Sequence, residues 1–161
     1  KYTVEWHEKP FNYFDEHILN RLITLLKNKY DIVYIRPCGS EKNYCNDENN
    51  VLPFGDYAMI RESHPEVILF ADLLERYPDE DYNTLQFMVE AASERHISVS
   101  GGNAAVAAYF GGDLVIYDSL ARYPDRGIWR TGSWLKRLGG SKVYGVNDYD
   151  KLWSLVESLW I

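Results

Sequence analysis

One stretch of the sequence, residues 96–118, restricts the possible folds more than any other. It reads HISVSGGNAAVAAYFGGDLVIYD, an alanine-rich run between two short apolar runs. Gly101-Gly102 precedes the alanine-rich run and Gly111-Gly112 follows it. Asparagine is favoured at helix starts and glycine at helix ends, so Asn103 is expected to cap a short helix that stops at the second glycine pair. The stretch therefore predicts a strand, a glycine turn, a helix and a second strand.

The turn formed by Ser100, Gly101, Gly102 and Asn103 is a candidate phosphate-binding site. The N–H groups in the first turn of a helix have no partner within the helix, and the helix dipole favours an anion there. The turn lacks the Gly-x-Gly-x-x-Gly spacing and does not follow the first predicted strand, which disfavours a dehydrogenase-type dinucleotide site. A plain tight turn is the alternative interpretation of these residues.

Strand-like and helix-like runs alternate along the whole chain. Apolar runs predict strands at residues 3–7, 31–35, 67–73, 96–100, 114–117 and 142–146. Apolar residues at helical spacing predict helices at residues 14–30, 56–62, 83–92, 103–110 and 129–138. A final helix is predicted after Asn147, with the apolar face Leu152, Leu155, Val156 and Leu159. Because no tight hairpin turn joins neighbouring strands, the pattern predicts an α/β fold, a doubly wound Rossmann-like three-layer sandwich. Its parallel strands, about six of them, are expected in the order 3-2-1-4-5-6.

Residues that typically begin or end helices refine this pattern. Asn83, with Gln86 three residues later, predicts a capping box, and Asn147 is expected to cap the last helix. The glycine pairs at 111–112 and 139–140 follow predicted helices and are expected to end them with a positive φ. The sequence contains no internal repeat, low-complexity tract or linker, so residues 1–161 are expected to form a single domain.

Composition limits the class of protein. The chain has 161 residues, of which 46% are hydrophobic and 25% charged, enough for one domain with a substantial core. No apolar run approaches membrane-spanning length, and the start does not resemble a signal peptide. Cys38 and Cys45 share a polar loop, which predicts a reducing, cytoplasmic compartment, with a small loop disulfide as the alternative. The four histidines are scattered, so no metal site is expected. The first residue is Lys1, and we expect a processed chain or a piece of a longer one.

The net charge of −7 argues against general nucleic-acid binding. One segment, residues 121–137, is nevertheless basic, because it holds only one acidic residue, Asp125. Its basic residues are Arg122, Arg126, Arg130, Lys136 and Arg137. Such a segment is either a solvated face or a binding site for a small anion.

The predicted strand order brings the glycine turn and basic side chains together. Its crevice opens between the first and fourth strands, where the loops containing Lys9 and Ser100–Asn103 meet. The basic segment follows the fifth strand, the next neighbour. A diphosphate needs both backbone amides and positive charge, so this convergence predicts a diphosphate site. Asp72 and Asp118 close the third and fifth strands and are candidates for binding ribose hydroxyls, with turn or cap roles as the alternative.

The run DYNTLQFMVEAASERHISVSGGNAAVAAYFGGDLVIYDS resembles the nucleotide-sugar-binding half of GT-B fold glycosyltransferases, with heptosyltransferase-like proteins as the nearest comparison. The shared features are a helix, a strand ending in a small-residue turn, an alanine-rich helix and another strand. The resemblance covers the predicted third to fifth strands, and the rest of the chain only by topology.

The resemblance implies a nucleotide-diphosphate sugar as donor substrate, bound without a cofactor or an obligatory metal. Ser100, Gly101, Gly102 and Asn103 would hold the phosphates. Asp118 and Ser119 would contact the nucleoside. The cationic candidates, which would stabilise the leaving diphosphate, are Lys9, Arg126 and Arg130.

The sequence departs from that family in two respects. The acidic residue that grips the ribose has no clear counterpart, and the chain has one domain where GT-B enzymes have two. The resemblance therefore implies an N-terminal acceptor-binding domain or a partner chain, without which sugar transfer is inefficient. The alternatives are a non-catalytic Rossmann-like nucleotide-binding or protein-interaction module, which would use Trp160 and Ile161, and a different α/β enzyme. No Ser-His-Asp order, Walker lysine or zinc motif supports a hydrolase.

Overall fold

The structure is a computed structural model that describes residues 13–36, 54–119 and 134–161. The chain divides into two compact units. The described residues of the first unit lie within Phe14–Met88, and those of the second are Tyr13 and residues within Val89–Ile161. The single domain over residues 1–161 stays a prediction.

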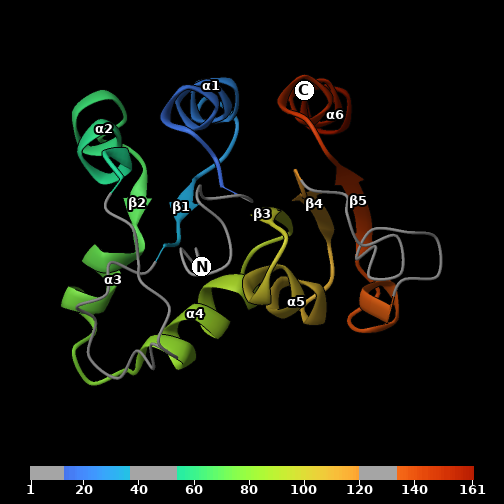
Figure 1. The fold of residues 1–161 in the computed structure, drawn as a ribbon. Helices are drawn as coiled ribbons and strands as arrows, with labels where there is room; N and C mark the ends of the chain where they lie inside the picture. The colour runs from blue at the N-terminus through green and yellow to red at the C-terminus, as the bar shows by residue number, and fades with distance from the viewer. Residues whose placement is uncertain (1–12, 37–53, 120–133) are drawn as a thin grey trace, which may run out of the picture. The chain divides into compact units, whose positions relative to one another are not determined.

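The first unit is built on a two-stranded parallel sheet in which Val33 pairs with Ile68 and Tyr34 with Leu69. Helices α1 and α2 lie on one side of this sheet and α3 on the other (Figure 1). The elements are α1 (Glu16–Leu26), β1 (Val33–Tyr34), α2 (Asp56–Ser63), β2 (Ile68–Leu69), α3 (Phe70–Arg76) and the start of α4 (Tyr82–Ala91).

Amphipathic periodicity explains how α1 packs in the first unit. Its buried residues recur at helical spacing: Ile18, Leu19, Leu22, Ile23 and Leu26. Asp15 caps the helix by accepting a hydrogen bond from the N–H of Ile18 at 2.8 Å. Two of the buried side chains, Leu19 and Ile23, form a core cluster with Ile60, Val67 and Leu69.

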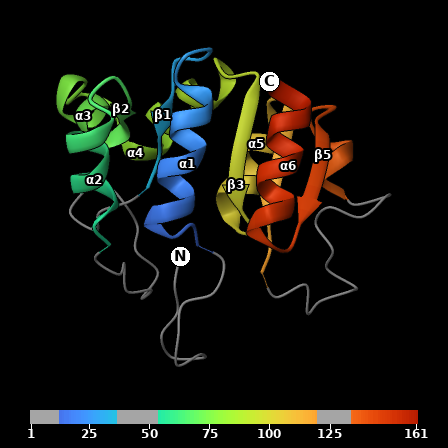
Figure 2. The ribbon, with the colours of Figure 1, turned by 90° about the horizontal axis from the view of Figure 1, so that it is seen from above.

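The second unit is built on a three-stranded parallel sheet in the order β3-β4-β5. Helix α6 covers one face, and α5 and the 3₁₀ helix η2 cover the other (Figures 1 and 2). The elements are β3 (Arg95–Val99), α5 (Gly102–Tyr109), β4 (Asp113–Tyr117), η2 (Trp134–Arg137), β5 (Lys142–Val146) and α6 (Tyr149–Trp160).

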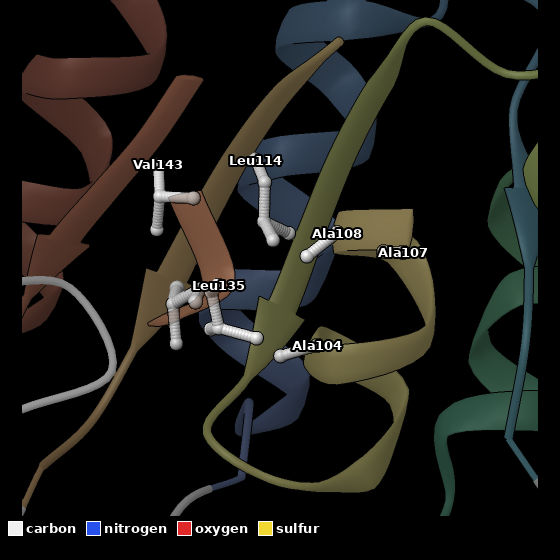
Figure 3. Packing of buried hydrophobic residues seen from close by; sticks show 7 residues of the cluster. Ala104, Ala107, Ala108, Leu114, Leu135 and Val143 are labelled. Carbon is white, nitrogen blue, oxygen red and sulfur yellow. The ribbon is translucent and has the colours of Figure 1, made fainter. Parts of the chain in front are cut away.

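The alanines of α5 explain how closely this helix packs. Ala104, Ala107 and Ala108 are buried against Leu114 of β4 and Leu135 of η2 (Figure 3). The strand β4, with the apolar run Leu114–Tyr117, is buried throughout that run. A strand covered on both faces needs such a continuous apolar run, and this is the pattern that the sequence shows.

The structure confirms an α/β fold with parallel strands. The described pairings are those that the order 3-2-1-4-5-6 requires between its second and third strands and among its fourth to sixth strands. The predicted first strand, residues 3–7, lies outside the described residues, so the six-strand order stays a prediction. The positive φ predicted after the α5 helix is confirmed, at 87° for Gly111 and 76° for Gly112.

The strand predicted at residues 67–73 is wrong beyond Leu69, because the chain turns into α3 at Phe70. The segment FADLLER contains strong helix formers, and Phe70 is buried with its ring 5.1 Å from that of Tyr82. Asp72 therefore does not close a strand. It lies in the first turn of α3 and pairs with Arg61 at 2.5 Å.

Three predicted helix caps are also wrong. Asn103 lies inside α5, which begins at Gly102 after Gly101 as the capping position. Asp81 instead of Asn83 accepts the N–H of Thr84 at the start of α4, at 2.9 Å. Asp148 instead of Asn147 accepts the N–H of Lys151 at 2.7 Å. Aspartate is an equally good capping residue, and in each of the last two cases it lies directly before the helix.

Two predictions for the segment before β5 also need correction. The helix expected over residues 129–138 is, in its described part, only the short 3₁₀ helix η2. Of the glycine pair at 139–140, only Gly140 has a positive φ, 76°. A Cβ at Gly139 would lie 2.1 Å from the carbonyl oxygen of Tyr109, so this glycine is explained by a close backbone approach.

Candidate functional site

The candidate site lies at the carboxyl edge of the β3-β4-β5 sheet. Ser100 directly follows β3 and donates its N–H to the carbonyl oxygen of Tyr117 at 2.8 Å. Asp118 directly follows β4 and donates its N–H to the carbonyl oxygen of Val146 at 2.9 Å. These two bonds extend the ladders past the strand ends and fix Ser100 and Asp118 on the same edge. Ligands of parallel α/β sheets bind at this edge.

The turn into α5 leaves backbone N–H groups accessible at this edge. Gly101, Gly102 and Asn103 are exposed, and a Cβ at either glycine would meet no atom of the described residues within 4 Å. Within the described residues, no side chain caps α5, as is also the case for α2 and α3, whereas Asp15 caps α1 and Asp148 caps α6. The start of α5 thus combines N–H groups that no described side chain caps with open space beside its two glycines, within the described part of the chain.

The structure brings some of the predicted site residues together. Ser100, Gly101, Gly102 and Asn103 lie in one turn, and Asp118 and Ser119 follow the neighbouring strand. Lys9, Arg126 and Arg130, the predicted cationic residues, lie outside the described residues, as does Arg122. The turn and the carboxylate are therefore placed by the structure, and the predicted positive charge is not.

A basic residue that sequence reasoning did not single out lies just after β5. Lys151, in the first turn of α6, places its Nζ 2.9 Å from Asn147 Oδ1 and 2.8 Å from Asp148 Oδ2. These contacts tie its amino group to the two residues that follow Val146. The position of Lys151 could have been predicted from the strand at residues 142–146. Residues that directly follow a parallel strand lie at the carboxyl edge of the sheet.

The most buried ion pair among the described residues of the first unit lies after β1. Arg36 donates to both carboxylate oxygens of Asp56, at 2.5 Å and 2.6 Å, and the hydroxyl of Tyr34 donates to Asp56 Oδ2 at 2.7 Å. The Arg36 guanidinium also lies 5.1 Å from the ring centre of Tyr57. Burial lowers the pKa of Arg36, but the hydrogen bond and charge of Asp56 outweigh it and raise that pKa overall. Each charge is satisfied within the protein, so this cluster is structural.

The two C-terminal residues bear on the alternative of a protein-interaction module. Trp160 is buried and its indole Nε1 lies 3.4 Å from Asp113 Oδ2, so its ring is not on the surface as the interaction-module alternative requires. Its neighbour Ile161 is exposed.

Among the described residues, no helix is long and apolar enough to cross a membrane. The same residues contain no group of three or more His, Cys, Asp or Glu side chains that could hold a metal ion.

Comparison with known proteins adds no relative. No protein-family model, curated protein or solved structure matches the chain.

Proposed function

We propose that the chain binds the diphosphate of a nucleotide-sugar donor at the carboxyl edge of β3-β4-β5, as the donor-binding part of a glycosyltransferase. The observation that carries the proposal is the open, uncapped start of α5 on the same edge as Asp118. The proposal keeps the predicted strand order 3-2-1-4-5-6. An N-terminal domain or a partner chain would supply the acceptor.

Each group at the edge has a role in this proposal. The N–H groups of Gly102 and Asn103 donate to phosphate oxygens, with the α5 dipole adding to the attraction. The carboxylate of Asp118 accepts hydrogen bonds from ribose hydroxyls, and Ser119 lies beside it. Lys9, Arg126 and Arg130 supply the positive charge that stabilises the departing diphosphate. No metal ion is needed for these contacts.

Calorimetric titration with UDP, GDP, ADP and CMP is expected to show saturable binding that selects among the four nucleotides. The Gly102→Val variant should lose this binding, because its side chain would occupy the space beside Gly102 in which the phosphate is proposed to bind. Tyr109→Val is the matched control, since Tyr109 is exposed at the other end of the same helix, and it should bind normally. Absence of binding by the unaltered chain, or full binding by Gly102→Val, would contradict the proposal.

Replacement of Arg126 or Arg130 by alanine is expected to weaken nucleoside diphosphate binding by about 1–3 kcal/mol each, the range for a lost charge-assisted hydrogen bond. The corresponding nucleoside, which lacks phosphate, should bind both variants as it binds the unaltered chain. Calorimetry on each variant measures both ligands. Unchanged diphosphate affinity in both variants would show that neither arginine contacts the diphosphate. The role of the glycine turn would then be tested by the Gly102→Val variant alone.

A further inference from the structure

Apart from the candidate nucleotide site, the structure contains a buried histidine with a partner on each ring nitrogen. His64 follows α2 and is only 3% exposed. Its Nε2 lies 2.6 Å from Asn20 Oδ1, and its Nδ1 lies 3.3 Å from Lys27 Nζ. The same Nζ forms an ion pair with Glu66 Oε1 at 2.8 Å. A histidine, an amide, a lysine and a carboxylate thus form one connected cluster in the first unit.

The chemistry of these partners fixes the protonation state of the ring. A lysine ammonium can only donate hydrogen bonds, so Nδ1 must accept and carries no proton. The ring proton is therefore on Nε2, which donates it to the amide oxygen of Asn20. His64 is neutral in this arrangement, and the neutral ring makes a bond that the protonated ring cannot make.

The cluster joins α1 to the connection between α2 and β2. Asn20 belongs to α1, and Lys27 is the residue that ends it. The backbone of His64 donates to the carbonyl oxygen of Ile60 at 2.8 Å and accepts the N–H of Val67 at 3.0 Å. The ring is thus held on the chain that ends α2 and leads directly into β2, and it reaches α1 through its side chain.

Protonation would convert this attraction into repulsion. A proton on Nδ1 would replace the accepting lone pair with an N–H group that faces the Lys27 ammonium. Two positive charges would then lie about 3–4 Å apart in a partly buried site, where water screens them poorly. The remaining bond to Asn20 would not offset this repulsion. The contact between His64 and α1 is therefore sensitive to a single proton.

The other charged groups around His64 do not alter this conclusion. Burial lowers the pKa of His64, Lys27 lowers it further, and Glu66 opposes part of the effect. Arg61 of α2 and Asp72 of α3 line the same small hollow as His64. They pair with each other at 2.5 Å, so their charges largely cancel at the ring.

We propose that His64 is a proton-operated latch, which bonds α1 to the α2–β2 connection when neutral and breaks that bond when protonated, so that α1 is then held there by its apolar contacts. The released ring regains an ordinary pKa of 6.5, and the latched ring titrates below it. Between these two values the released form binds one more proton, so release is favoured as the pH falls below 6.5. The equilibrium constant for release should rise about tenfold per pH unit in that interval.

Nuclear magnetic resonance on the unaltered chain tests the latch directly. The His64 ring is expected to show the Nε2–H form and to titrate below 6.5. Hydrogen-exchange protection of the Val67 and α1 amides, corrected for intrinsic rates, should fall about tenfold per pH unit between the two pKa values, while protection of β4 stays constant. Equal losses in α1 and β4, no loss in either, or titration of His64 at or above the ordinary value would overturn the proposal.

Two substitutions with opposite expected effects sharpen this test. Lys27→Met removes the repelling charge and should raise the pKa of His64, which shortens the interval of release. Glu66→Gln removes the attracting charge and should lower that pKa, which extends the interval. His17→Gln on the exposed face of α1 is the matched control and should leave the His64 titration unchanged. Shifts of the same sign in the first two variants would contradict the latch.

Discussion

Replacement of Asp56 by alanine is expected to lower the free energy of unfolding by about 3–5 kcal/mol, the range found when one partner of a buried ion pair is removed. The side chain of Asp56 is 5% exposed and accepts two hydrogen bonds from Arg36 and one from Tyr34. Without the carboxylate, the Arg36 side chain, which is only 16% exposed, would keep its charge but lose the two hydrogen bonds and the ion pair that Asp56 provides. Urea denaturation followed by circular dichroism measures the change.

The Arg61–Asp72 pair supplies a control of the same chemistry and distance. Its ion pair is also 2.5 Å long, but its side chains are 58% and 40% exposed. Asp72→Ala should therefore lower the free energy of unfolding by no more than about 1 kcal/mol, as for other exposed ion pairs. Equal effects of the two substitutions would show that burial does not determine the importance of the Arg36–Asp56 pair.

The sequence predicted the sheet of the second unit well because its strands are short, apolar and bounded by glycine. Residues 142–146 form β5 as predicted, and β3 and β4 each begin one residue before the predicted start. Gly111-Gly112 marks a real helix end, because both residues have a positive φ that other residues rarely adopt. In these cases the local sequence was sufficient to predict the strands and the end of the helix.

Local chemistry was not sufficient where two local preferences competed. The run from Val67 to Leu73 is apolar enough for a strand, but its second half has good helix formers and belongs to α3 from Phe70 onward. The predicted asparagine caps failed for a related reason, since Asp81 and Asp148 also satisfy the capping rule. The local sequence alone does not show which of two neighbouring capping residues, asparagine or aspartate, begins the helix.

The part of the candidate site that follows the parallel strands could be predicted from the sequence. Parallel strands that lead into Ser100 and Asp118 must present both residues at one edge, whatever the rest of the chain does. The Arg36–Asp56 pair and the Asn20–His64 contact join residues 20 and 44 positions apart. Nothing in the sequence near either residue indicates its partner, so these clusters emerged only from the structure.

Replacement of Gly112 by alanine is expected to lower the free energy of unfolding by about 2–5 kcal/mol, from a left-handed backbone and an overpacked contact combined. Its φ is 76°, and a Cβ would lie 2.2 Å from the carbonyl oxygen of Glu94, a backbone atom. That oxygen accepts the N–H of Asp113 at 2.9 Å, so the clash falls on the first bond between the β3 and β4 segments. Urea denaturation measures the loss.

Gly140→Ala separates the two causes of this loss. Gly140 has the same φ of 76°, but a Cβ there would meet no atom within 4 Å in the part of the chain that the structure describes. Its cost should be limited to the left-handed backbone, about 1–2 kcal/mol. Equal costs at the two positions would contradict the clash with Glu94. A larger cost for Gly112→Ala would show that the close approach of the backbone at Glu94 demands glycine there.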